Sequence, residues 1–185
     1  MKALRIMLVI VLVIAALNSK SIKADDEDPS EHQIKITKDI RRMTRQTAKI
    51  CARVLKRAQK EYKELQKKEK AIQEDIKLLA EVIFYENWTT DPEKESAWLT
   101  GVVVLNRVKS KDWPNTVHDV LYQRGQYSTT KKFFTKELPD EVYAMAEDLI
   151  RNGTGDVPEN VVFQSTFKQG KGIYKVIKGE YFCYG

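Results

Sequence analysis

The stretch LAEVIFYE, residues 79–86, decides how the C-terminal part of this chain folds. All but two of its residues are apolar or aromatic, and the carboxyl group of Glu86 closes the run. This pattern predicts a helix that ends near Asn87 and Trp88. A second helix is expected to restart around residues 90–93, because Thr90 or Asp91 can cap it and Pro92 fits a first turn. It should run towards Val108.

The remaining C-terminal residues predict short elements separated by turns. Residues 113–116 suggest a turn, 117–122 a short helix and 125–128 a polar loop. Residues 139–151 predict an amphipathic helix stopped by Asn152-Gly153. Residues 161–164, 173–177 and 181–184 read as strands. The fold class expected is therefore α+β, mostly helical, with a small antiparallel sheet at the C-terminus.

Upstream, residues 34–79 contain no Gly or Pro, and apolar residues recur in steps of three and four. The spacing predicts one or two amphipathic helices, with a slip in register near Val54. Residues 35–70 carry 14 Lys/Arg against 4 Asp/Glu. This basic face could hold anionic wall polymers or a membrane surface, or it could be a solvated spacer.

The N-terminus predicts export. Lys2 and Arg5 precede an apolar run over residues 6–17, and the small residue Ala24 precedes an acidic stretch. This order indicates a signal peptide over residues 1–24, or a membrane anchor if it is not cleaved. Four parts follow: this leader, an acidic linker at 25–33, the basic helical segment at 34–77 and a domain at 78–185. We expect the protein to be secreted, in the cell wall or a periplasm-like space, and export argues against nucleic acid as a partner.

Several chemistries are disfavoured by the residues present. The two histidines, His32 and His118, are too few for a zinc site of the usual kind. Cys51 and Cys183 lie far apart, and neither is placed like a catalytic thiol, so we expect two unrelated thiols. Gly-rich phosphate loops are absent. No metal and no cofactor are expected.

A carboxyl group is what remains as a candidate. Glu86 follows Val82, Ile83 and Phe84, and apolar surroundings raise the pKa of a carboxyl group towards the range that a glycosidic general acid needs. Taken alone this is a weak signal, because a Glu at a helix end is usually solvated.

The order of segments over residues 78–184 resembles the catalytic domain of the spore cortex-lytic (SleB/CwlJ-type) cell wall hydrolases. The resemblance is carried by residues 79–86, by VVLNRVKS at 103–110, by WPNT at 113–116, by VLY at 120–122 and by GQYS at 125–128.

The resemblance implies a lysozyme-like fold related to that of lytic transglycosylases, with Glu86 as the catalytic residue. It implies cleavage between N-acetylmuramic acid and N-acetylglucosamine, leaving 1,6-anhydromuramic ends. Gln126 and Tyr127 match the Gly-Gln-aromatic segment and are expected to contact sugar. Gln164 and Tyr174 could line the same groove. Asn106 is expected to brace the fold.

The chain departs from the family at two places: Thr90 replaces a second Glu, and Glu180 stands where a His is usual. Three alternatives stay open. The first is a hydrolytic muramidase with a second carboxylate, and the second is a wall-binding protein without catalysis. The third is a coiled-coil assembly protein built on residues 34–79; otherwise a monomer is expected.

Overall fold

The computed structural model describes residues 31–88 and 93–185 of the chain. The predicted signal peptide, most of the linker and the predicted caps at residues 90–92 lie outside these residues. The chain divides into two compact units, with the boundary between Ala58 and Gln59. Among the described residues, no helical stretch has the length and apolar character that a bilayer crossing requires.

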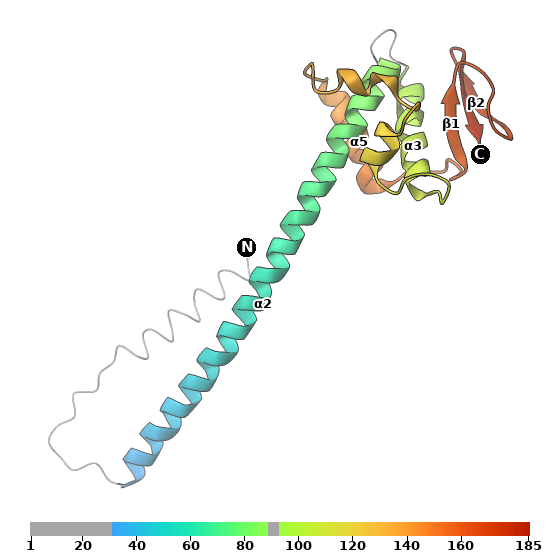
Figure 1. Ribbon diagram of the computed structural model, residues 1–185. Helices are drawn as coiled ribbons and strands as arrows, with labels where there is room; N and C mark the ends of the chain where they lie inside the picture. Colours follow the sequence, from blue (N-terminus) through green and yellow to red (C-terminus); the bar gives the residue numbers. More distant parts are fainter. Residues whose placement is uncertain (1–30, 89–92) are drawn as a thin grey trace. The chain divides into compact units, whose positions relative to one another are not determined.

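A single helix, α2 (Glu31–Ile83), forms the segment for which one or two helices were expected (Figure 1). It begins three residues before the predicted start, so residues 31–33 are helical and not part of a linker. It also continues without a break through Val54 and into the LAEVIFYE stretch, because a slip in the apolar stripe removes no backbone hydrogen bond and the segment holds no Gly or Pro. In the first unit the apolar side chains of α2, such as Ile40 and Met43, are exposed.

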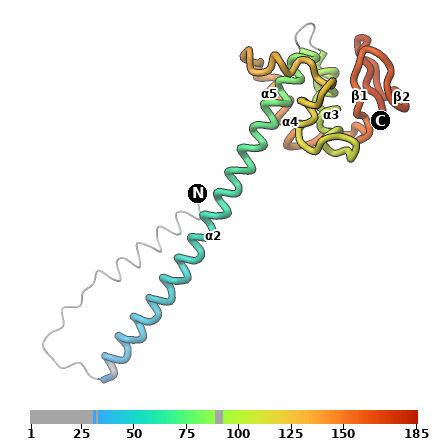
Figure 2. The backbone as a smooth tube through the Cα atoms, viewed as in Figure 1, coloured from blue at the N-terminus to red at the C-terminus, as the bar shows by residue number. Residues whose placement is uncertain are grey.

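The second unit contains the end of α2 and all the later elements. The π-helical turn η1 (Phe84–Trp88) is followed by α3 (Lys94–Lys109), α4 (Val117–Tyr122), the 3-10 helix η2 (Ser128–Lys132) and α5 (Asp140–Asn152). The helix α3 is central, because it contacts η1, α4, α5 and the sheet (Figure 2). Its residues from Leu99 to Arg107 are all buried.

The C-terminal sheet has three antiparallel strands in the order β1-β3-β2, which confirms the expected small sheet. Its strands are β1 (Val161–Ser165), β2 (Gly172–Ile177) and β3 (Glu180–Tyr184). The hairpin between β2 and β3 turns through Lys178 and Gly179, whose φ angles of 47° and 85° suit a tight two-residue turn. Because Ile177 pairs with Glu180, this turn fixes where the first side chain of β3 lies.

The core of the second unit joins residues far apart in the chain. Leu79, Ile83, Val103, Leu149 and Phe182 have at most 1% of their surface exposed. A Cβ on Gly101 would lie 2.5 Å from Leu149 Cδ1 and 3.0 Å from Ile83 Cδ1, so α2 and α5 both press on α3 at this point. Burying each large apolar side chain contributes about 1.5–3 kcal/mol.

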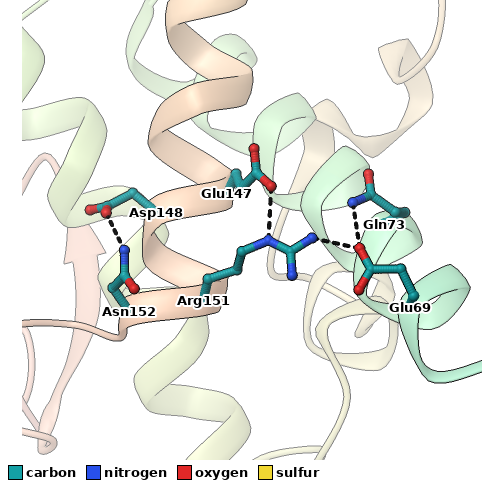
Figure 3. A network of polar contacts seen from close by, with 6 residues as sticks. All are labelled: Glu69, Gln73, Glu147, Asp148, Arg151 and Asn152. Carbon is teal, nitrogen blue, oxygen red and sulfur yellow. Dashed lines mark hydrogen bonds and ion pairs between the residues drawn. The ribbon is translucent and has the colours of Figure 1, made fainter. Parts of the chain in front are cut away.

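The second unit begins earlier than residue 78, where the domain was expected to start. Ile76 belongs to its core. Arg151 of α5 donates hydrogen bonds to Glu69 of α2, at 2.6 Å, and to Glu147 on its own helix, at 2.8 Å. Gln73 holds the same oxygen of Glu69, as Figure 3 shows. The last turns of the basic segment are therefore part of the folded domain.

Candidate active site

Glu86 is the middle residue of the π-helical turn that ends α2. The apolar stripe of α2 passes through Ile76, Leu79 and Ile83, in steps of three and four, and the next step in an unbroken α-helix would fall on Glu86. The turn widens at this point, and Glu86 is half-buried instead of lying in the core. Single π-helical turns inside helices are rare overall, but those that occur are often found at functional sites.

Among the described residues, one side chain donates a hydrogen bond to Glu86. The hydroxyl of Thr129, in η2, donates a hydrogen bond of 2.5 Å to Glu86 Oε1. Burial raises the pKa of Glu86, and the nearby charge of Glu180 raises it too, while the Thr129 hydroxyl and Lys132 lower it. Burial is the largest of these effects. The carboxyl group therefore keeps its proton to a higher pH than a solvated Glu does.

Glu180, the first residue of β3, is a second acidic group of this site. Ser96 of α3 donates a hydrogen bond of 2.9 Å to its Oε2, and Gln164 of β1 donates one of 2.7 Å to its Oε1. Both oxygens are thus fixed by side chains from other elements. The Oε1 atom of Gln164 is buried without a hydrogen-bond partner.

A chain of hydrogen bonds joins the turn that holds Glu86 to Glu180. Asn87 donates to the hydroxyl of Thr100 through its side-chain amide. Thr100 in turn donates to the backbone oxygen of Ser96, at 3.0 Å. Because Ser96 holds Glu180, helix α3 carries a continuous polar connection between the two acidic residues.

Arg107 positions the loop before η2. It is only 5% exposed, and its Nε donates to the backbone oxygen of Val162 at 2.7 Å. Its Nη1 donates to Gln126 Oε1 at 3.1 Å and to the Tyr127 hydroxyl at 3.3 Å. The guanidinium also lies over the ring of Trp113, 4.1 Å from its centroid. One buried cation therefore orients the two loop residues that were expected to contact sugar.

Tyr127 lies within electrostatic reach of both acidic residues. Burial raises the pKa of its hydroxyl, Arg107 lowers it, and Glu86 and Glu180 each raise it. Of the residues expected in the site, Glu86 carries one of the two carboxyl groups, and Tyr127 and Gln164 lie near this pair. Gln126 joins them through Arg107 but is exposed.

Tyr174 is the predicted residue that the described contacts do not bring to Glu86. Its ring lies against that of Tyr184, with centroids 5.9 Å apart in an edge-on arrangement. Asn106 braces the fold, as expected, because its amide donates to the backbone oxygens of Pro158 and Val161, each at 3.0 Å.

Glu81 is a buried acid that the sequence did not single out. It is 1% exposed, and its Oε2 has no hydrogen-bond partner. Burial raises its pKa, while the backbone N–H of Phe134 lowers it. Phe134 has a φ angle of 61°, which is unusual for a residue other than Gly. Glu81 thus sits beneath the segment that follows η2.

Two further features bear on the chemistry. A hollow of about 460 Å³ is lined by Trp113, Phe163 and Glu159 among others, but Glu86 is not one of its lining residues. Within the described residues, no group of three or more His, Cys, Asp or Glu side chains is arranged to hold a metal ion. Cys51 and Cys183 are both free thiols.

Residues 91–178 match the family model described as Cell Wall Hydrolase. Over these residues the chain is similar to the cell wall hydrolase family. The matched segment supplies Ser96, Arg107, Tyr127, Thr129 and Gln164, whereas Glu86 and Glu180 lie just outside its two ends. No curated protein and no solved structure matches the chain.

The residues that sequence reasoning missed are Ser96, Arg107, Thr129 and the partnership of Glu180. Arg107 lies inside the motif at residues 103–110, and Thr129 directly follows the motif at residues 125–128. The sequence therefore pointed to the segments that contain these two residues, but not to their roles. Nothing in the sequence indicated that Ser96 and Glu180, 84 residues apart, would form a hydrogen bond.

Proposed function

We propose that this cell wall hydrolase cleaves peptidoglycan glycan strands between N-acetylmuramic acid and N-acetylglucosamine, as a lytic transglycosylase with Glu86 as its acid and base. The observation that carries the proposal is the state of Glu86. Its carboxyl group is half-buried, its pKa is raised by burial, and Thr129 fixes one oxygen, while no other described side chain donates a hydrogen bond to the group. A general acid needs a proton at working pH and a fixed direction in which to donate it.

The proposed reaction balances without a cofactor. Glu86 gives its proton to the glycosidic oxygen as the bond from C1 of the muramic residue breaks. The resulting carboxylate then takes the proton of the same sugar's 6-hydroxyl, whose oxygen bonds to C1 and closes the 1,6-anhydro ring. Gln126 and Tyr127, both oriented by Arg107, are placed to contact the sugars.

A hydrolytic muramidase is the second candidate, and the position of Glu180 favours it. Retaining and inverting glycosidases both use a second carboxylate near the acid. Glu180 is a carboxylate whose charge acts on Glu86. In this case water would complete the reaction and leave a reducing end.

Mass spectrometry of digested peptidoglycan tests the proposal. The full chain and Glu86→Gln would be compared, with Glu137→Gln as a matched control because Glu137 is exposed and has no part in the proposed reaction. Anhydromuramic ends that are lost only in Glu86→Gln are expected. Reducing ends would instead assign a muramidase. If no variant releases fragments but all pellet with the wall, the protein binds its substrate without cleaving it.

We also propose that the first unit holds the protein near an anionic surface outside the cytoplasm. Lys38, Arg41, Arg42, Arg45 and Lys49 line one side of α2, and the exposed apolar side chains of the stripe, such as Ile36, Ile40 and Met43, lie on the opposite side. Basic amphipathic helices bind anionic lipid or polymer surfaces. Co-sedimentation with anionic vesicles or wall polymer should fall steeply with added salt; salt-independent sedimentation would count against a charge-based contact.

A further inference from the structure

We propose that Glu180 is a positioning residue for the cleavage reaction, and that its fixed carboxylate keeps the proton on Glu86. The inference rests on the proposed role of Glu86 and adds a partner to it. It is drawn from the placement of Glu180, on β3, against side chains of α3 and β1 and near the turn η1 that holds Glu86.

The placement of Glu180 begins with the hairpin. The turn at Lys178 and Gly179 makes Glu180 the first residue of β3, on the strand at the centre of the sheet. Its two oxygens then accept hydrogen bonds from Ser96 of α3 and Gln164 of β1. A side chain held at both oxygens by donors from two other elements is fixed in its orientation.

The connection to Glu86 runs through α3. Asn87, the residue after Glu86, binds Thr100, which binds the backbone oxygen of Ser96. Ser96 holds Glu180. The turn containing Glu86 and the strand containing Glu180 are therefore fixed against the same helical face, and a movement of the Asn87 side chain or of the Glu180 carboxyl group would break a bond in this chain.

The charges around Glu86 come from two elements. On β3, Glu180 raises the pKa of Glu86, and on η2, Lys132 lowers it. The uncharged partner on η2 is Thr129, which also lowers it, and the Tyr127 phenol is within reach of both acids. Among these groups, Glu180 is the one whose charge, like burial, raises the pKa of Glu86. A like charge disfavours ionisation of its neighbour.

The consequence is a division of roles between two carboxyl groups of one site. Glu180 is held by two donors, whereas among the described residues Glu86 accepts one side-chain hydrogen bond, and burial raises its pKa. Glu86 is the group that can donate a proton.

The test is a titration of Glu86 by carbon NMR in the full chain labelled at Glu carboxyl carbons. The Glu86 signal is assigned as the one missing from Glu86→Gln. In Glu180→Gln, its midpoint should fall by about half a unit to one unit, since one nearby negative charge is removed. Glu95→Gln is the matched control, because Glu95 pairs with Lys175 and does not act on Glu86. It should leave the midpoint unchanged.

An unchanged midpoint in Glu180→Gln, or an equal fall in Glu95→Gln, overturns the inference. If Glu180→Gln does not fold, Glu180→His above neutral pH gives the same comparison without a negative charge. The titration needs no substrate, so its result is separate from that of the cleavage assay. A folded Glu86→Gln that still cleaves glycan removes the proposed function, whereas an unmoved midpoint beside an inactive Glu86→Gln removes this inference alone.

The pH profile of cleavage supplies a readout that a purely structural role of Glu180 would not move. In Glu180→Gln the alkaline limb of kcat/KM should shift to lower pH by the amount seen in the titration, while activity on the acidic side is retained. A uniform loss of activity at every pH would overturn the proposed role.

Discussion

Replacing Thr129 by Val removes the one described side-chain hydrogen bond to Glu86 while keeping the shape of the side chain. The Thr129 hydroxyl donates to Glu86 Oε1 at 2.5 Å, and it lowers the pKa of the carboxyl group because it stabilises the charged form. A hydrogen bond to a charged group contributes about 1.5–3 kcal/mol. Because loss of this hydrogen bond disfavours the charged form, the pKa of Glu86 should rise.

The direction of the effect on activity follows from the role of Glu86 as an acid. A raised pKa keeps Glu86 protonated to higher pH, so the alkaline limb of the kcat/KM profile should move to higher pH. The assay is release of soluble glycan fragments from purified peptidoglycan between about pH 4 and 10, a range that brackets ordinary and raised carboxyl pKa values.

Two further variants make the experiment specific. Thr129→Ser keeps the hydroxyl and should keep the limb close to its original position. Thr130→Val removes a neighbouring hydroxyl that donates to the backbone oxygen of Tyr127 and not to Glu86, so it controls for damage to η2. A limb that stays in place, or moves to lower pH, in Thr129→Val would refute the assignment of Thr129 as the partner that favours ionised Glu86.

Two other predictions concern stability. Burial raises the pKa of Glu81 in the folded protein, so stability from this group is present below the unfolded pKa and is lost as the pH rises through the folded one. Glu81→Gln should therefore be more stable than the original protein at pH 8, by about 1.4 kcal/mol for each pKa unit that separates the folded carboxyl group from the unfolded one. Near pH 4 the two proteins should be equally stable. Urea unfolding at both pH values would show this, and an equal difference in stability at both would contradict it. Gly101→Val should lower the free energy of unfolding by about 1–3 kcal/mol or more, because the Cβ already meets Leu149 and Ile83. Thermal unfolding measures it, and an unchanged midpoint would mean that the two side chains can move aside.

The sequence predicted most elements of the second unit because their ends carry local signals. The short helix α4 has the predicted bounds, with Thr116 as its cap: its hydroxyl accepts from the Asp119 N–H at 3.1 Å. Helix α5 stops at Gly153, where φ is 90°, as the Asn-Gly pair indicated. The strands lie within one residue of their expected positions. The lysozyme-like fold stays a prediction.

The basic segment was harder to divide. Its register slip near Val54 suggested an interruption, but the backbone hydrogen bonds of α2 do not depend on which face is apolar. The start of the second unit depends on contacts such as that between Glu69 and Arg151, which are 82 residues apart. Spacing along one helix does not show such a contact.

The candidate site was predicted in part for the same reason. Glu86, Gln126 and Tyr127 stand in recognisable motifs, and their neighbours follow from the local chain. Gln164 was expected to line the sugar groove, and the structure shows it holding Glu180. Its partner could not be predicted, because the pairing requires β1 and β3 to be adjacent and α3 to lie beside them.

The π-helical turn at residues 84–88 also has a meaning in genetic terms. A turn of this kind holds one residue more than an α-helical turn, so it corresponds to one inserted codon in the gene. Losing a single codon just before Glu86 would restore the α-helical phase and turn Glu86 and the two residues after it by about 100°. The reading frame and the helix would both survive such a deletion, while Glu86 would be carried away from Thr129. A deletion or insertion of one codon at this position would therefore remove or restore the acid function of Glu86 without substituting the residue itself.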